Sequence, residues 1–374
     1  MRRFALALIA LALGACAHNL PVVDLPNSAT TAAQARVYVD INGTLFPPNW
    51  RSDDVVGERL VRRRHSIYAA INGDKDRLDA LHGAELAHLS QISELAADRA
   101  RVFVFLVGFN TNQRNTAVEL RAMQDRIGLT EHDLAIEFYW DGHDAGLGID
   151  AARIWFWGTG SSQVAGQRGL RRVLNAVGDR EIIIVSYSRG ASVVLSALAD
   201  PAYSPSFARR TERLTYLPLD GQTFLQADPL RPGPAIRVIM LAPAIGQPDF
   251  WAKDSIEDNW TYRELPARVS SIRYSINHRD IVLTKGGIGL ADNFNATDLG
   301  AYMDAGAELD CHYRVLQGYS VVGHVDHGVS NYIADASFAA MVRDSGVAVR
   351  GEPTPTSPAP IVRRDCSSAA LLQR

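Results

Sequence analysis

The stretch EIIIVSYSRGASVVLSALA, residues 181–199, predicts a strand, a sharp turn and a helix in direct succession. The aliphatic run 182–185 is typical of a strand buried on both faces, as in a parallel sheet. Ser188 follows this strand, and the small residues Ser186 and Gly190 stand two positions before and after it. Small residues at these positions allow a tight strand-to-helix turn, so we expect a nucleophile elbow that projects the Ser188 hydroxyl above the sheet.

Strands and helices alternate over most of the remaining chain. Patterns of apolar residues predict further strands at 36–40, 101–107, 134–140, 235–242 and 269–276, and helices at 76–97, 112–127 and 165–177. Such alternation predicts an α/β fold with a mostly parallel central sheet and helices on both faces. Ligands of such folds bind at the carboxyl ends of the strands, which is where we expect Ser188. The folded domain is expected to span residues 35–350 of the 374-residue chain.

The N-terminus has the features of a secretory signal. Residues 1–15 combine two arginines, an apolar run and a small-residue cleavage site just before Cys16. The sequence L-G-A-C at 13–16 resembles the bacterial lipobox, which implies that Cys16 is the site of lipid attachment. An ordinary secretory signal and an uncleaved anchor are the alternatives. Residues 16–34 are then expected to be a tether, and the Pro-rich residues 351–374 an extended tail.

This signal predicts a lipoprotein of the bacterial cell envelope that faces the periplasm. Ala17, rather than Asp, follows Cys16, which favours the outer membrane over the inner one. In an oxidising compartment the two remaining cysteines, Cys311 and Cys366, could form a disulfide or stay free thiols. The net charge of −3 and the lack of a basic run argue against a nucleic-acid partner.

A second segment is expected to complete the site around Ser188. The strand at 101–107 ends at Gly108, and a loop with Phe109, Asn110 and Thr111 follows. A backbone amide from such a loop can join the amide after the nucleophile in an oxyanion hole. We expect the amides of Phe109 and Arg189 to be these two donors.

These motifs together resemble the α/β-hydrolase superfamily. Residues 102–332 are more narrowly similar to a little-characterised bacterial esterase/lipase-like family, in which a strand ends in H-G-F-N, a W-P or W-D turn follows, and the elbow has the form H-S-x-G. The turn corresponds here to Trp140-Asp141. Val107 and Tyr187 stand where the family has histidine. The first replacement is expected to weaken hydrogen bonding in the loop, but neither removes a catalytic residue.

The resemblance implies a catalytic triad in the chain order Ser, acid, His. Asp280 follows the strand at 269–276 and is the predicted acid, with Asp249 as the alternative. His327 precedes a segment suited to a short helix and is the predicted base, with His324 as the alternative. His324, Asp326 and His327 could also form a metal site. However, the pattern H-x-x-H differs from the i, i+4 spacing of helical metal ligands, and no further ligand stands nearby. No metal or other cofactor is implied.

We therefore expect a serine hydrolase that cleaves a carboxylic ester or related acyl bond of a small molecule through an acyl-enzyme. A non-catalytic envelope lipoprotein with a degenerate hydrolase fold and an acyltransferase that uses the same triad are the alternatives. Residues 37–45 resemble a phosphatase signature that begins at Asp40, but Asn42 replaces its second aspartate. The Gly-rich residues 141–162 are expected to form a lid over the site.

Overall fold

The computed structural model describes residues 18–22, 24–25, 27, 30–52, 56–64, 66–144, 160–200, 228–253, 260–284, 298–301, 309–322, 324–350 and 361–362. Eight strands form the main sheet in the order β1-β3-β2-β4-β5-β8-β9-β10. The first seven of these are parallel to their neighbours, and β10 is antiparallel to β9. Their bounds are Ala33–Tyr38 (β1), Asp133–Tyr139 (β3), Arg101–Leu106 (β2), Glu181–Tyr187 (β4), Ile236–Leu241 (β5), Val269–Ile276 (β8), Leu316–Ser320 (β9) and Ile361–Val362 (β10).

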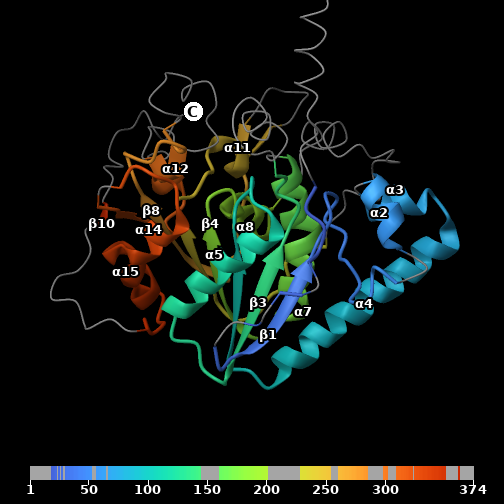
Figure 1. Cartoon of the computed structure of the whole chain (residues 1–374). Helices are drawn as coiled ribbons and strands as arrows, with labels where there is room; N and C mark the ends of the chain where they lie inside the picture. The colour runs from blue at the N-terminus through green and yellow to red at the C-terminus, as the bar shows by residue number, and fades with distance from the viewer. Residues whose placement is uncertain are drawn as a thin grey trace, which may run out of the picture.

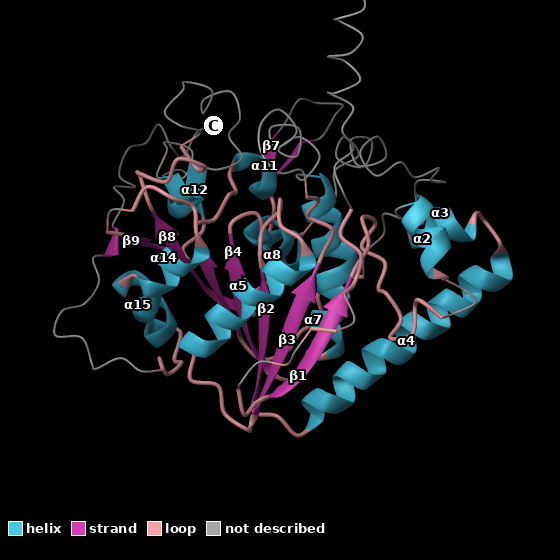
Figure 2. Ribbon diagram, in the orientation of Figure 1, coloured by secondary structure: helices cyan, strands magenta, loops and turns pink. Residues whose placement is uncertain are grey.

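Helices cover both faces of the sheet, which confirms the predicted α/β class. One face packs against α4 (Lys75–Ala97), η1 (Ala165–Leu170), α7 (Arg171–Ala176) and α8 (Gly190–Leu198). The other face packs against α5 (Gln113–Arg126), α14 (Val329–Ala334) and α15 (Ala336–Asp344). Figure 1 shows α5 and α15 in front of the sheet and α7 behind it. In Figure 2 the arrowheads of β1 and β3 point to the top of the view, where the carboxyl ends of the parallel strands lie.

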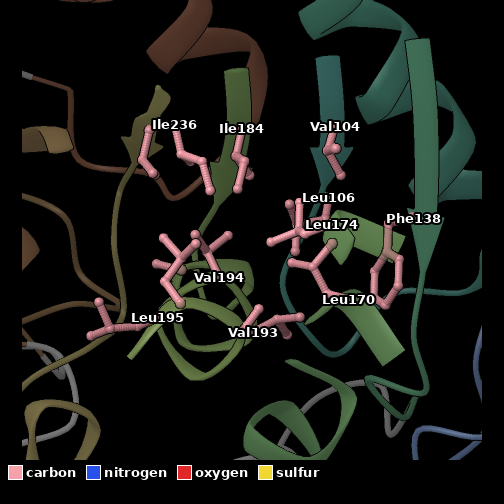
Figure 3. Packing of buried hydrophobic residues seen from close by; sticks show 14 of the residues in the cluster. Val104, Leu106, Phe138, Leu170, Leu174, Ile184, Val193, Val194, Leu195 and Ile236 are labelled. Atoms are coloured by element: carbon pink, nitrogen blue, oxygen red, sulfur yellow. The ribbon is translucent and has the colours of Figure 1, made fainter. Parts of the chain in front are cut away.

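The alternation of side chains along each strand divides the core into two layers. In β2, Val102, Val104 and Leu106 belong to the layer of α7 and α8, and Phe103 and Phe105 belong to the layer of α5. Both sets are fully buried, which explains the uninterrupted apolar sequence of this strand. Figure 3 shows three consecutive valine and leucine side chains of α8, at 193–195, packed among β4, β5 and the η1–α7 helix.

The elbow helix approaches its neighbour closely. A Cβ atom on Gly166 of η1 would lie 2.1 Å from the carbonyl oxygen of Val193 in α8, so only glycine fits at this contact. The helix predicted at 165–177 is already formed at residues 160–164, is π-helical at 165–170, where Gly166 lies against α8, and continues as α7. This contact fixes α8, and with it the turn that carries Ser188, against the rest of the domain.

Smaller elements flank the sheet. Helices α2 (Glu58–Arg64) and α3 (Ile67–Ile71) pack against α4 around a small separate apolar cluster. Beyond β5, α11 (Gln247–Phe250) leads into the hairpin of β6 (Trp251–Lys253) and β7 (Trp260–Tyr262), and α12 (Asp298–Ala301) follows β8. Within the described part of the chain, no helix combines the length and the apolar character needed to cross a membrane.

The described N-terminal residues contact the domain, although we expected residues 16–34 to form a tether. Leu25 and Ala32 are buried in the layer of α5, and the Arg36 guanidinium donates to the Leu25 carbonyl at 2.7 Å. Strand β1 also begins at Ala33, three residues before the predicted strand. The polar composition of this segment concealed its few apolar contact residues, which are spaced too irregularly for a strand or helix pattern.

Candidate active site

Ser188 lies at the carboxyl end of β4, in the centre of the sheet. Its φ angle of 54° falls in the left-handed region, which is unusual for a residue other than glycine. Its amide donates to the Leu241 carbonyl of the neighbouring strand at 2.8 Å, and α8 begins two residues later, at Gly190. A Cβ atom on Gly190 would lie 3.0 Å from the Val107 carbonyl oxygen. The sequence S-Y-S-R-G therefore forms the strained strand-to-helix turn that was predicted for it.

Three residues that are far apart in the sequence meet at this turn. The Nε2 atom of His327 lies 2.8 Å from the Ser188 Oγ atom, and its Nδ1 atom lies 2.6 Å from the Asp280 Oδ2 atom. Asp280 follows β8, and His327 lies between β9 and α14. The structure thus joins Ser188, His327 and Asp280 in one continuous chain of hydrogen bonds. In this chain the imidazole lies between the serine and the carboxylate, as a base must between a nucleophile and an orienting acid.

The Asp280 carboxylate is fully buried and has several donors. Its Oδ2 atom also accepts the Tyr332 hydroxyl at 2.5 Å, and its Oδ1 atom accepts the amides of Val282 and Leu283 at 2.9 and 3.1 Å. Burial by itself would raise the pKa of Asp280, but the hydrogen bond and charge of His327, together with the hydrogen bonds from the Tyr332 hydroxyl and the Leu283 amide, hold it below its usual value. Asp280 therefore stays ionised beside the imidazole. The role of Tyr332 was not predicted from the sequence.

The loop after β2 lies directly against the nucleophile. A Cβ atom on Gly108 would lie 3.0 Å from both the Ser188 Oγ atom and the Arg189 backbone nitrogen, so a side chain at this position would occupy the reaction site. The Asn110 amide donates to the Gly142 carbonyl at 3.0 Å, and the Trp140 indole donates to the Val107 carbonyl at 2.8 Å. The turn after β3 therefore holds this loop in place through these two hydrogen bonds.

A cavity of about 660 Å³ opens beside Ser188 and His327. The described residues that line it are Gly108, Phe109, Asn110, Thr111, Asn115, Val118, Glu119, Tyr187, Ser188, Val282 and His327. Its volume is that of a site for a small organic ligand. Phe109 belongs to this lining, and the Arg189 nitrogen lies close to Gly108, so both predicted oxyanion donors belong to residues beside the nucleophile.

Glu119, on α5, gives the cavity an acidic group that sequence analysis did not identify. Burial raises the pKa of Glu119 to about 7, so its carboxyl changes charge near neutral pH. Tyr187, which also lines the cavity, packs with its ring centroid 5.2 Å from that of His327. Glu119 lies one helical turn after Asn115, which also lines the cavity. Two polar residues at this spacing are also typical of an ordinary solvent-exposed helix face, so no sequence pattern indicated that Glu119 belongs to the site.

The Arg189 side chain points away from the cavity and forms a second buried network. Its guanidinium contacts both Asp249 oxygens at 3.1 Å and donates to the Ala244 carbonyl at 2.8 Å. Asp249 also accepts the Ser192 hydroxyl at 2.6 Å. Both charged side chains are almost completely buried. Asp249, the alternative acid, is therefore the partner of Arg189, whereas Asp280 is the partner of His327.

The alternative base, His324, lies near the triad but has different partners. Its Nδ1 atom is 3.1 Å from the Asp326 carbonyl oxygen, and its ring packs edge-on against Tyr332 at 4.5 Å. In the described residues, the His324, Asp326 and His327 side chains do not form a group suited to hold a metal ion. His327 is thus the histidine that the structure brings to Ser188.

Asp40, the first residue of the phosphatase-like signature, has a structural role. Its carboxylate accepts the backbone amides of Asn42, Thr44 and Ile67 at 2.8 to 2.9 Å. It therefore joins the turn after β1 to the start of α3. The proposed lipid attachment site Cys16, and most of the expected lid at 141–162, lie outside the described residues. Cys366 also lies outside them, so its pairing with Cys311 stays a prediction.

One group of described side chains has the composition of a metal site. Potential ligand atoms of His18, Asp141 and His143 all lie within 4.8 Å of one another. However, the His18 Nδ1 and Asp141 Oδ2 atoms are 2.5 Å apart. Two ligands bound at about 2.0–2.2 Å to one tetrahedral zinc ion would be separated by more than about 3 Å. The pair therefore has the geometry of a charge-assisted hydrogen bond, which attaches the N-terminal segment to the turn after β3.

Comparisons with known proteins add little to this geometry. No family model and no curated protein sequence matches the chain. A solved structure, described as the crystal structure of an uncharacterized protein from Pseudomonas aeruginosa, aligns with 10% identity and a TM-score of 0.23. The alignment covers 52% of this chain and 38% of that one, so the similarity spans well under half of the other protein.

Proposed function

We propose that this protein is a serine hydrolase with an α/β-hydrolase fold that cleaves a carboxylic ester or a related acyl bond. The observation that carries the proposal is the continuous hydrogen-bonded chain from the Ser188 Oγ atom through His327 to Asp280. Its members follow β4, β8 and β9, which is the chain order Ser, acid, His of that superfamily. The left-handed Ser188 and the glycine contacts beside it are further support, because strain of this kind is typical of functional sites.

The proposed reaction has two halves. Ser188 Oγ attacks the substrate carbonyl while His327 Nε2 takes the serine proton, and the amides of Phe109 and Arg189 stabilise the charge that develops on the carbonyl oxygen. His327 then protonates the leaving alcohol, and an acyl-enzyme remains. Water, deprotonated by His327, releases the acid and restores Ser188. Asp280 keeps the His327 proton on Nδ1 and stabilises the imidazolium in both halves.

Hydrolysis of a water-soluble ester such as p-nitrophenyl acetate tests this function. We expect turnover by the wild type, and its loss in Ser188→Ala with the folded structure retained in circular dichroism. A mass increase of one acetyl group on Ser188 in a rapidly quenched sample would identify the acyl-enzyme. A folded wild type that shows neither turnover nor acetylation would contradict the proposal and favour a non-catalytic protein. Transfer of the acetyl group to an added alcohol in preference to water would identify an acyltransferase.

The signal-like N-terminus leads to a second part of the proposal, which concerns location. We propose that Cys16 carries a lipid and that the protein is a lipoprotein of the bacterial envelope, on the periplasmic side of the outer membrane. The support is the sequence of residues 1–16. Mass spectrometry of the N-terminal peptide from membrane fractions tests it: an acylated Cys16 is expected, and a chain that begins elsewhere would contradict it.

A further inference from the structure

The exposed apolar side chains of the protein are unevenly distributed. Among the described residues, the large hydrophobic side chains with the greatest exposure are Leu60, Leu86, Leu95, Val118, Ile281, Val322 and Val325. The three leucines lie on α2 and α4, at a distance in sequence from any site residue. The other four, which we call the apolar rim, all belong to segments that carry the triad or line its cavity.

Each rim residue is tied to the site. Val118 lines the catalytic cavity, and Ile281 directly follows Asp280. Val322 and Val325 lie between β9 and His327, with 77% and 54% of their surface exposed. The Ile281 amide donates to the Val325 carbonyl at 3.1 Å, which joins the loops after β8 and β9. Apolar side chains exposed around a reaction site indicate contact with an apolar partner rather than with water alone.

The N-terminal segment reaches the same edge of the sheet. The Asn19 amide group donates to the carbonyl of Thr111, which lines the catalytic cavity, at 2.8 Å. His18 is bound to Asp141, at the carboxyl end of β3. Cys16 precedes His18 by only two residues, and two residues span at most about 7 Å. Because His18 and Asn19 are held beside the turn after β3 and the loop that contains Thr111, a lipid on Cys16 would be attached no more than about 7 Å from His18 at this edge of the sheet.

The cavity lining limits the charge of the substrate. The described lining residues include the carboxyl group of Glu119 and contain no lysine or arginine. A phosphate group beside the scissile ester would find no cation among these residues. The lining therefore favours an ester whose neighbouring groups carry no negative charge.

We propose that the catalytic cavity opens toward the membrane surface that the Cys16 lipid enters, and that its substrate is an uncharged acylglycerol ester held in that membrane. This inference rests on the proposed serine hydrolase function and on acylation of Cys16. Ser188 Oγ forms a bond to the fatty acyl carbon, the glycerol oxygen leaves with the proton from His327, and water releases the fatty acid. The apolar rim contacts the lipid surface while the acyl chain enters the cavity.

The experiment uses full-length acylated protein in phosphatidylcholine vesicles that contain a fluorogenic diacylglycerol. The rim variant carries Val322→Asp and Val325→Asp, and the matched control carries Leu86→Asp and Leu95→Asp on α4, where the two leucines are 65% and 42% exposed. Turnover of p-nitrophenyl acetate is measured in parallel because it does not require contact with the vesicle. We expect the rim variant to lose at least about tenfold in vesicle turnover, with soluble turnover within twofold of wild type and the control unaffected.

The outcomes separate the inference from the function on which it rests. Equal vesicle turnover by wild type and rim variant, or an equal loss in the control, would overturn the membrane-facing site. Wild type that hydrolyses the soluble ester but not the diacylglycerol would overturn the substrate class and leave the hydrolase function intact. An unmodified Cys16 would overturn the inference as well. Absence of soluble turnover in folded wild type would instead contradict the proposed function itself.

Discussion

Asp249 and Asp280 both follow strands of the parallel sheet, and both are fully buried, but they belong to different kinds of site. Asp249 faces the guanidinium of Arg189, which offers only hydrogen-bond donors and no site that accepts a proton. Asp280 faces His327, whose second nitrogen reaches Ser188 and can accept and release a proton. The first arrangement can only stabilise the fold, whereas the second can move a proton. The adjacent residues Ser188 and Arg189 connect the two regions.

The largest expected effect on catalysis comes from removing the negative charge of Asp280. Asp280→Asn keeps the shape of the side chain but no longer fixes the His327 tautomer or stabilises the imidazolium. We expect kcat/KM for p-nitrophenyl acetate to fall about 10⁴-fold. Asp249→Asn is the matched substitution and leaves the proton path in place. A loss of similar size in folded Asp249→Asn would mean that the two carboxylates had been assigned the wrong roles.

The substitution Asp249→Asn should lower the stability of the fold rather than the rate of catalysis. Asp249→Asn leaves the Arg189 guanidinium buried without a counter-charge, and breaking such a pair costs about 3–5 kcal/mol. Urea unfolding should show a lower free energy of unfolding and a lower midpoint than in wild type. Unfolding indistinguishable from that of wild type would show that the network of Arg189 is not a stabilising ion pair.

A smaller effect is expected from the second donor to Asp280. Tyr332→Phe removes the hydroxyl that lies 2.5 Å from the Asp280 Oδ2 atom and leaves the ring in place. A hydrogen bond to a charged group contributes about 1.5–3 kcal/mol, so we expect a loss of at least about tenfold in kcat/KM. Tyr319→Phe is the control, because the Tyr319 hydroxyl, on β9, donates to Asp344 of α15 at 2.6 Å and lies outside the triad. Equal losses in both variants would indicate a general effect on folding.

The smallest effect concerns Glu119 and depends on pH. Its pKa is raised from 4.5 to about 7, so the folded protein holds this proton to a higher pH than the unfolded chain does. The stability contributed by the neutral carboxyl is therefore lost as pH rises from about 4.5 through 7. Glu119→Gln should melt a few degrees above wild type at pH 8 and close to it at pH 5. A difference that is larger at pH 5 would contradict the raised pKa.

Much of the fold could be predicted because buried parallel strands have distinctive sequences. The apolar run of β2 indicated its strand to within one residue, that of β4 marked four of its seven residues, and the helical spacing of α4 was equally clear. Strand β9, with the sequence LQGYS, was not predicted, since it lacks such a run and contains a glycine. That glycine lies against β8, where a Cβ atom would be 2.5 Å from the Ile276 side chain. The glycine is needed there because of a contact between strands, which local sequence patterns do not reveal.

The residues of the candidate site likewise fall into those that local sequence patterns indicated and those that they did not. Ser188, Asp280 and His327 stand beside local signals, namely an elbow, a strand end and the residues before a short helix. Tyr332 and Glu119 lie on helix faces whose direction depends on how α14 and α5 pack on the sheet. The attachment of His18 to Asp141 joins residues 123 positions apart through two polar side chains, and no periodicity signals such a pair.

In the proposed mechanism, His327 and Asp280 activate Ser188. The most direct measurement is labelling of the full-length protein by a fluorophosphonate probe, with mass spectrometry to find the modified residue. We expect rapid labelling of wild type on Ser188, none in Ser188→Ala, and a large decrease in His327→Ala, with folded Asp249→Asn labelled as fast as wild type. A folded wild type that stays unlabelled, or labelling that persists in His327→Ala, would contradict this mechanism.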